Sequence, residues 1–120
     1  MSERNPLVYL LHMRDCCDRL IECAGLRDEG IVPAHILLDA VCRNLEVLGE
    51  ASRKVSADFR GIHIEIPWRE MSDLRNVLIH NYDVAEASMI WGIADREIPR
   101  VMAHLSKLLA AGPQSPLPDM

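Results

Sequence analysis

Residues 33–55, PAHILLDAVCRNLEVLGEASRKV, decide the class of fold. Their apolar residues recur at spacings near 3.5, which predicts a long amphipathic helix opened by Pro33. The apolar seam comprises Leu37, Val41, Leu48, Ala51 and Val55, and Asn44 stands in it where an apolar residue is expected. The opposite side carries charges three or four positions apart, where unlike charges on a helix are neighbours: Asp39, Arg43, Glu46, Glu50 and Arg53.

A second helical pattern precedes this one. Asn5 can cap a helix that has Pro6 at its first position, and the pattern continues until Gly25. Its apolar residues are Leu7, Leu10, Leu11, Leu20, Ile21 and Ala24. Residues 27–32 are predicted to form a polar turn between the two helices.

The chain after residue 55 predicts further helices separated by a loop. Residues 57–66 carry weak signals and are predicted as a loop, after which Pro67 restarts a helical run. Ser72 or Asp73 can cap the segment that reaches Asn81. A last helix is expected over 85–110, kinked or divided by Pro99. Its predicted stripe is Met89, Ile90, Ile93, Ile98, Met102, Leu105 and Leu109.

Length and composition agree with an all-α domain. A chain of 120 residues is one domain's worth, and 49% of its residues are hydrophobic while only 4% are aromatic. An aliphatic core of this kind favours packed helices over a β-sandwich. We therefore expect a small four- to five-helix bundle over residues 1–112, followed by a Pro-rich flexible tail over 113–120.

Charge and cysteine usage exclude several classes of protein. A net charge of −5 argues against non-specific coating of nucleic acid, although a small local basic site remains compatible with it. The cysteines lack C-x-x-C metal spacing and are expected to be reduced thiols: Cys16, Cys17, Cys23 and Cys42. No stretch approaches the ~20 apolar residues of a membrane span. We expect a soluble cytoplasmic protein with no membrane partner, no metal and no cofactor.

Residues 74–83, LRNVLIHNYD, hold the densest cluster of polar side chains among apolar ones. On a helix, Arg75 and Tyr82 lie about 20° apart and share a face, whereas His80 lies about 140° from Arg75. A straight helix in one subunit therefore does not aim Arg75 and His80 at one point. They could converge if the arginine arm wraps, if the helix unwinds near His80, or if two copies meet across a two-fold axis.

The chemistry open to this set is cleavage of RNA without a metal. His80 could take the proton from a ribose 2′-hydroxyl or protonate the leaving oxygen, because imidazole titrates near neutral pH. Arg75 could hold the phosphate and stabilise the charge that grows in the transition state. With the 2′-hydroxyl as nucleophile, the reaction would be specific for RNA. By spacing alone, an arginine and a histidine this close on a helix are more often a surface pair or a histidine hydrogen-bonded to backbone.

These motifs resemble those of the HepT-like family within the HEPN superfamily. The resemblance is carried by residues 66–69 (IPWR), by residues 74–82 (LRNVLIHNY), by Ile90-Trp91 and Ile98-Pro99, and by residues 40–51 (AVCRNLEVLGEA). It implies a helical bundle that dimerises, with the R-x-x-x-x-H-x-Y motifs of two subunits lining a shared cleft. It also implies a metal-independent endoribonuclease that cuts RNA as the toxin of a type VII-like toxin–antitoxin system.

The family pattern assigns catalysis to Arg75 and His80 and makes Tyr82 the target of modification. The implied antitoxin is a minimal nucleotidyltransferase that transfers AMP from ATP to this tyrosine. Asn76 is expected to orient His80 or cap local backbone, and Arg43 and Glu46 either hold Arg75 at the cleft or form a solvated helix face. The alternative function is a catalytically inactive helical partner of the nucleotidyltransferase. Trp68 and Trp91 are expected to anchor the core or an interface.

Overall fold

The computed structural model describes residues 5–81 and 87–111, and every regular element in these ranges is helical. The order is α1 (Pro6–Glu29), α2 (Ala34–Lys54), α3 (Ala57–Ile62), α4 (Trp68–Ser72), α5 (Leu74–Asn81), α6 (Ala87–Gly92), the π-helical segment η1 (Ile93–Glu97) and α7 (Ile98–Ala111). The prediction of an all-α fold is confirmed. The expected tail over 113–120 lies outside the described residues, as does Tyr82. In the described ranges, no helix is both long and apolar enough to cross a membrane.

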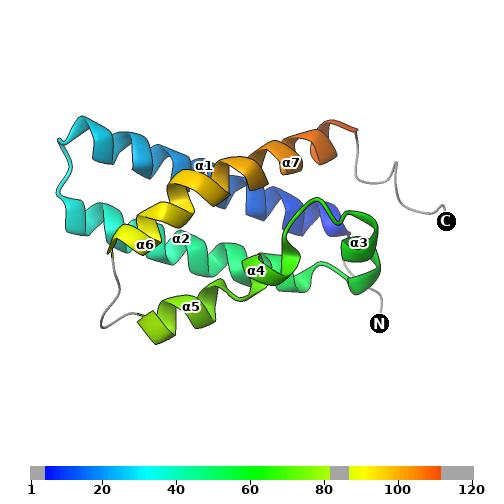
Figure 1. The fold of residues 1–120 in the computed structure, drawn as a ribbon. Coiled ribbons are helices and arrows are strands. Elements are labelled where there is room, and N and C mark those ends of the chain that lie inside the picture. Colours follow the sequence, from blue (N-terminus) through cyan, green and yellow to red (C-terminus); the bar gives the residue numbers. More distant parts are fainter. Residues whose placement is uncertain (1–4, 82–86, 112–120) are drawn as a thin grey trace.

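The helices form a bundle around the antiparallel pair α1 and α2 (Figure 1). α7 packs on α1, while α4 and α5 follow each other along α2. In Figure 1, α5 occupies the lower edge of the molecule and α1 the upper edge, and α2 runs between them. The segment that carries the candidate site therefore lies on the flank of α2, away from α1.

The first helix is longer than its sequence pattern predicts. α1 passes through Gly25 and ends at Glu29, so the turn expected over 27–32 begins later. Gly30 has φ 74°, the left-handed conformation that glycine adopts without steric cost, and its N–H donates to the carbonyls of Leu26 and Arg27. The helix ends at the glycine that can form this cap, and Asn5 caps its start by accepting from Leu7 N–H at 2.9 Å.

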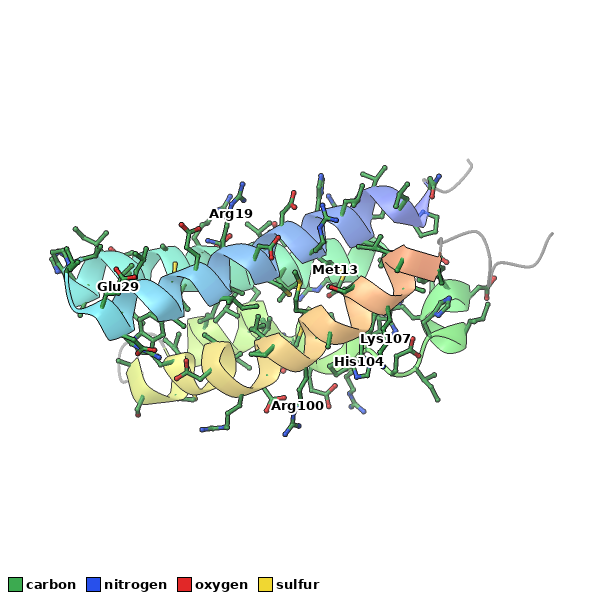
Figure 2. All side chains as sticks on the ribbon, turned by 90° about the horizontal axis from the view of Figure 1, so that it is seen from above. Met13, Arg19, Glu29, Arg100, His104 and Lys107 are labelled. Carbon is green, nitrogen blue, oxygen red and sulfur yellow. The ribbon has the colours of Figure 1, made fainter. Side chains whose placement is uncertain are left out.

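Cysteines supply much of the buried face of α1. Cys16, Cys17 and Cys23 are buried beside Leu10, Met13 and Leu20, while the predicted core residue Ile21 is 40% exposed. Met13 lies between α1 and α7 (Figure 2). All four thiols are free, as expected. Burial is the main cause that raises their pKa, and it raises the pKa of Cys17 to about 12, so these thiols stay protonated at neutral pH.

The seam of α2 follows the predicted face but uses Leu45 where the pattern pointed to Asn44. Leu37, Val41, Leu45 and Leu48 are buried, and Val55 closes the row just past the helix end. Asn44 is half-buried at the edge of the seam, where its Nδ2 donates to the Ala40 carbonyl at 2.8 Å. The amide is thus satisfied by its own helix without entering the core.

The loop predicted over 57–66 contains a short helix, α3, so this prediction is wrong. Ser56 caps α3 by accepting from Phe59 N–H at 3.2 Å, and Phe59 is buried. The Trp68 ring packs edge-on against Phe59, and its Nε1 donates to the His63 carbonyl at 2.8 Å. One buried aromatic cluster therefore stabilises a helix too short to show a periodicity. It also confirms Trp68 as a core anchor.

Pro99 divides the last helix, as the sequence predicts. Proline has no N–H to donate to the carbonyl four residues back, and the backbone before it widens into η1, where Ile98 N–H donates to the Ile93 carbonyl. The buried stripe is Ile90, Ala94, Ile98, Val101, Leu105 and Leu108. Val101 and Leu108 are buried in place of the predicted Met102 and Leu109. Four members of the predicted stripe are half-buried against the core: Met89, Ile93, Met102 and Leu109.

Arg27 connects the end of α1 to α6 and η1. Its guanidinium donates to Asp95 Oδ2 at 3.0 Å and to Asp28, and its Cζ lies 4.5 Å from the centre of the Trp91 ring. The bond to Asp95 is the main cause that raises the Arg27 pKa. Trp91 packs half-buried against the core, as its predicted role as an anchor requires.

Candidate active site

The candidate active site is built on α5, which begins directly after α4. Asp73 closes α4 and its carbonyl accepts from Val77 N–H at 3.0 Å, so the chain turns from one short helix into the next. α5 then places Arg75, Asn76 and His80 on one continuous helix. The segment begins after Asp73 and ends at Asn81, as the sequence predicts.

Gly49 sets how closely α5 approaches α2. A Cβ at this position would stand 2.8 Å from the Met71 carbonyl oxygen, 3.5 Å from Leu74 Cβ and 3.9 Å from Arg75 N. Only glycine allows this approach, which brings the α4–α5 junction against the α2 backbone. Leu74 is buried and fixes the first turn of α5 in the core. The apolar spacing of the second helix does not single out Gly49, although a glycine inside a helical pattern is a signal of close packing.

Arg75 is exposed at the first turn of α5 and carries an unpaired charge. Among the side chains that the structure describes, no carboxylate lies within ion-pair distance of it and no hydrogen bond fixes it. A guanidinium stays protonated, and no donor of Arg75 is used by a described side chain. Such a group is available to an anionic ligand.

His80 shares α5 with Arg75, and its side chain lies outside the described part of the chain. The helix continues through His80 to Asn81, so the backbone is still helical at His80, and the residues that follow Asn81 lie outside the described part of the chain. Five positions on a continuous helix turn the two side chains about 140° apart. The wrapping of the Arg75 arm and the meeting of two copies remain as routes to one site.

Asn76 is held by the residue that precedes α5. Its Nδ2 donates to Asp73 Oδ1 at 3.0 Å, and both side chains are exposed. The amide therefore binds a carboxylate at the helix start, and its oxygen faces no partner among the described residues. Whether Asn76 also orients His80 stays a prediction.

Arg43 and Glu46 pair with each other on α2. Arg43 Nη1 lies 3.2 Å from Glu46 Oε1, and the two side chains are 69% and 36% exposed. Glu46 lies one turn before Gly49 on α2, the helix against which α5 packs, but within the described residues it forms no ion pair with Arg75. An exposed pair of this kind adds about 0–1 kcal/mol to stability. In this single chain the two residues form a solvated helix face.

Two hollows flank the start of α5. One, of about 470 Å³, separates α4 and α5 from η1 and has an apolar floor that includes Met71, Leu74 and Ile93. The other, of about 400 Å³, lies at the junction of α4 and α5 and is lined by Arg53, Arg69, Glu70, Ser72 and Asp73. Within residues 5–81 and 87–111, no group of three or more His, Cys, Asp or Glu side chains is placed to hold a metal ion.

Comparison with known proteins places the chain among ribonucleases. A family model described as "Ribonuclease HepT-like" matches residues 13–108. A protein of Caldanaerobacter subterraneus subsp. tengcongensis named "Putative RNase" is 34% identical over 107 residues, which cover 88% of this chain and 96% of the relative. A Methanocaldococcus jannaschii protein, also named "Putative RNase", is 37% identical over 110 residues, covering 91% and 95%.

A third relative carries a more specific name. The Thermococcus cleftensis protein named "Probable ribonuclease HepT" is 42% identical over 69 residues, which cover 58% of this chain and 63% of the relative. No solved structure matches the chain significantly.

Proposed function

Because the chain belongs to the HepT-like ribonuclease family, we propose that it is a metal-independent endoribonuclease in which Arg75 and His80 act on one RNA phosphodiester. The observation that carries the proposal is an exposed Arg75, without an ion pair among the described side chains, on the same helix as His80. Arg75 would bind the scissile phosphate bidentately, and His80 would move the proton.

The reaction uses a nucleophile that RNA itself supplies. The ribose 2′-oxygen attacks phosphorus, and the bond from phosphorus to the 5′-oxygen breaks, which leaves a 2′,3′-cyclic phosphate and a 5′-hydroxyl. His80 either accepts the 2′-hydroxyl proton or donates a proton to the leaving 5′-oxygen. Arg75 stabilises the charge that accumulates on the non-bridging oxygens.

The site is proposed to form between two copies of the chain. Since Arg75 and His80 diverge on α5, a two-fold axis beside this helix lets Arg75 of one copy meet His80 of the other. Two Arg75 guanidiniums would then gather in one cleft of an otherwise acidic protein, and RNA binding would be confined to that cleft.

Mixing two inactive variants tests the shared site directly. Arg75→Ala and His80→Ala proteins are unfolded together, refolded as a 1:1 mixture and assayed on a fluorescent RNA. Half of the dimers then pair one chain of each kind, and one of their two sites is intact, so about a quarter of the wild-type activity should return. If each chain supplies both residues of its own site, the mixture stays inactive. Cleavage by His80→Ala alone at the wild-type rate would refute the catalytic role of His80.

Regulation is proposed to act at Tyr82. A cognate minimal nucleotidyltransferase, acting as antitoxin, would transfer AMP to the phenol, which lies two positions after His80 in the sequence. The added phosphate would occupy Arg75 and exclude RNA by charge and size. Mass spectrometry of the protein produced with the neighbouring gene should show increments of one AMP unit, absent in Tyr82→Phe. A protein that gains AMP but never cleaves RNA would favour the inactive-partner alternative.

A further inference from the structure

The hollow at the junction of α4 and α5 brings together two arginines from different elements. Arg53 comes from the last turn of α2 and Arg69 from α4, and both side chains are exposed beside Glu70, Ser72 and Asp73. Its volume of about 400 Å³ is within the range of small-molecule sites and can hold one nucleotide. The sequence patterns alone point to no binding role for either arginine.

Arg53 is already positioned for a ligand. Its Nε donates to the Ser72 carbonyl at 3.1 Å, which fixes the guanidinium across the α4–α5 junction. That bond uses one edge of the guanidinium, so the two Nη groups remain free to bind both oxygens of a phosphate. Holding the side chain before binding reduces the entropy that the ligand would otherwise have to offset.

The charges of this hollow are not compensated by ion pairs. Although Glu70 and Asp73 line the same space, neither lies within ion-pair distance of Arg53 or Arg69 among the described side chains. Asp73 is instead engaged by the amide of Asn76. The two guanidiniums can therefore bind an anion by donating to it, and the carboxylates can still accept from N–H or O–H groups of the same ligand.

The hollow continues the surface that carries Arg75. Gly49 and Arg53 are one turn apart on the same face of α2, about 6 Å along the axis. A Cβ added at Gly49 would lie 3.9 Å from Arg75 N, and Arg53 donates to the carbonyl of Ser72, three residues before Arg75. Three arginines that form no ion pair with the described carboxylates thus lie on α2, α4 and α5 around the α4–α5 junction.

We propose that the Arg53–Arg69 hollow is an RNA subsite that binds the nucleotide next to the scissile phosphate, with its phosphate on the two guanidiniums. The proposal rests on the proposed ribonuclease function, because Arg75 defines the scissile position. A nucleotide suits this mixed lining because its phosphate pairs with arginine, while base N–H groups or a 2′-hydroxyl can donate to Glu70 or Asp73. The subsite would fix the direction in which RNA crosses α2, α4 and α5.

The test compares a substrate that carries a phosphate next to the scissile one with a substrate that lacks it. Arg53→Ala/Arg69→Ala and wild-type protein are assayed on an oligoribonucleotide and on a dinucleotide, which has a single phosphodiester and no flanking phosphate. For the oligonucleotide, KM should rise about tenfold for each arginine removed, with kcat unchanged. For the dinucleotide, both constants should stay at wild-type values. Arg53→Lys/Arg69→Lys should recover part of the loss because it keeps the charges.

A matched control removes the same charge elsewhere. Arg19 on α1 and Arg100 on α7 are exposed and point outward away from the bundle (Figure 2). Arg19→Ala/Arg100→Ala should leave KM for both substrates within about twofold of wild type, because neither arginine lines the hollow and exposed charges outside a binding site contribute little to affinity. An equal rise of KM in this control would mean that the effect comes from net charge and would overturn the subsite.

Binding measurements keep the two proposals separable. In a His80→Ala background, fluorescence anisotropy gives the affinity for single-stranded RNA without cleavage. Removing both arginines, which share one phosphate, should reduce the magnitude of the slope of log K against log salt by about 0.7. If wild-type protein cuts no RNA but the slope falls, the ribonuclease proposal fails and the subsite stands. If RNA is cut and both the slope and KM are unchanged, or if the dinucleotide is affected equally, the subsite is refuted.

Discussion

Replacement of Gly49 by alanine tests whether the close contact between α2 and the α4–α5 junction holds the site in place. The new Cβ would lie 2.8 Å from the Met71 carbonyl oxygen, so this backbone must retreat by about 0.6 Å to reach the 3.4 Å of ordinary contact. The obstacle is a backbone atom, and Leu74 beside it is buried, so the neighbouring structure has little freedom to adjust.

The expected magnitude follows from two opposing effects. In a helix interior, glycine to alanine ordinarily stabilises a protein by about 0.5–1 kcal/mol. Overpacking against fixed neighbours costs about 1–3 kcal/mol. We expect Gly49→Ala to lower the free energy of unfolding by about 1–2 kcal/mol, which for a chain of this size lowers Tm by about 3–8 °C. Because the shift also moves Arg75, kcat on RNA should fall at least about tenfold.

Gly25 provides the matched control. It is a helical glycine in α1, and a Cβ added there would meet nothing within 4 Å, so Gly25→Ala should stabilise the protein by about 0.5–1 kcal/mol. Urea unfolding followed by circular dichroism at one protein concentration measures both variants, since dimerisation would make the stability depend on concentration. If Gly49→Ala is as stable as Gly25→Ala and keeps its kcat, the packing argument is refuted.

Three further predictions concern the rest of the bundle. Arg27→Ala removes the bond to Asp95 and the contact with Trp91, and should lower the free energy of unfolding in urea by about 1–2 kcal/mol. Arg14→Ala, which removes an ion pair only to the neighbouring Asp15, should lower it by under about 0.5 kcal/mol, and equal losses would contradict a stabilising role of the Arg27 contacts. Burial raises the pKa of Cys17 from an ordinary 9.0 to about 12, so the protonated thiol contributes fully to stability below pH 9. As pH rises from 9 to 12, the free energy of unfolding should fall by about 1.4 kcal/mol per pH unit. Cys17→Ala should show a smaller fall over that window, and an identical fall in both proteins would contradict the effect of the buried thiol. Trp68→Phe leaves the His63 carbonyl without its 2.8 Å donor and should cost about 1–3 kcal/mol, and a variant as stable as wild type would show that the bond contributes nothing.

Some features of the fold follow directly from local sequence. The 3.5-residue spacing from Leu37 to Val55 predicts α2, because one apolar stripe can be buried only if the backbone coils at that period. Asn5, Pro6 and Pro99 predict the start of α1 and the division of the last helix, because their effects are local: the Asn5 side chain accepts from a nearby N–H, and the prolines have no N–H to donate. The motif from Arg75 to Tyr82 indicates the family on residue identity alone, and the family is confirmed.

Other features depend on contacts between segments far apart in the chain. α1 continues past Gly25 because Gly30 can form the left-handed cap and Arg27 binds Asp95 and Trp91 on another helix. α3 forms because Phe59 and Trp68 share a buried cluster, and Leu45 replaces Asn44 in the seam because only an apolar side chain is stable there.

In the candidate site, too, some features follow from the sequence and others depend on contacts between distant segments. The sequence by itself determined which residues can bind phosphate and transfer a proton, since that chemistry belongs to the side chains of Arg75 and His80. Only the tertiary structure decided that Arg75 forms no ion pair with a described carboxylate. It also decided that Gly49 allows α5 to pack closely on α2, and that Arg53 donates to the Ser72 carbonyl beside Arg69. Burial and approach depend on how helices pack, and residue spacing within one helix carries no information about a neighbour on another.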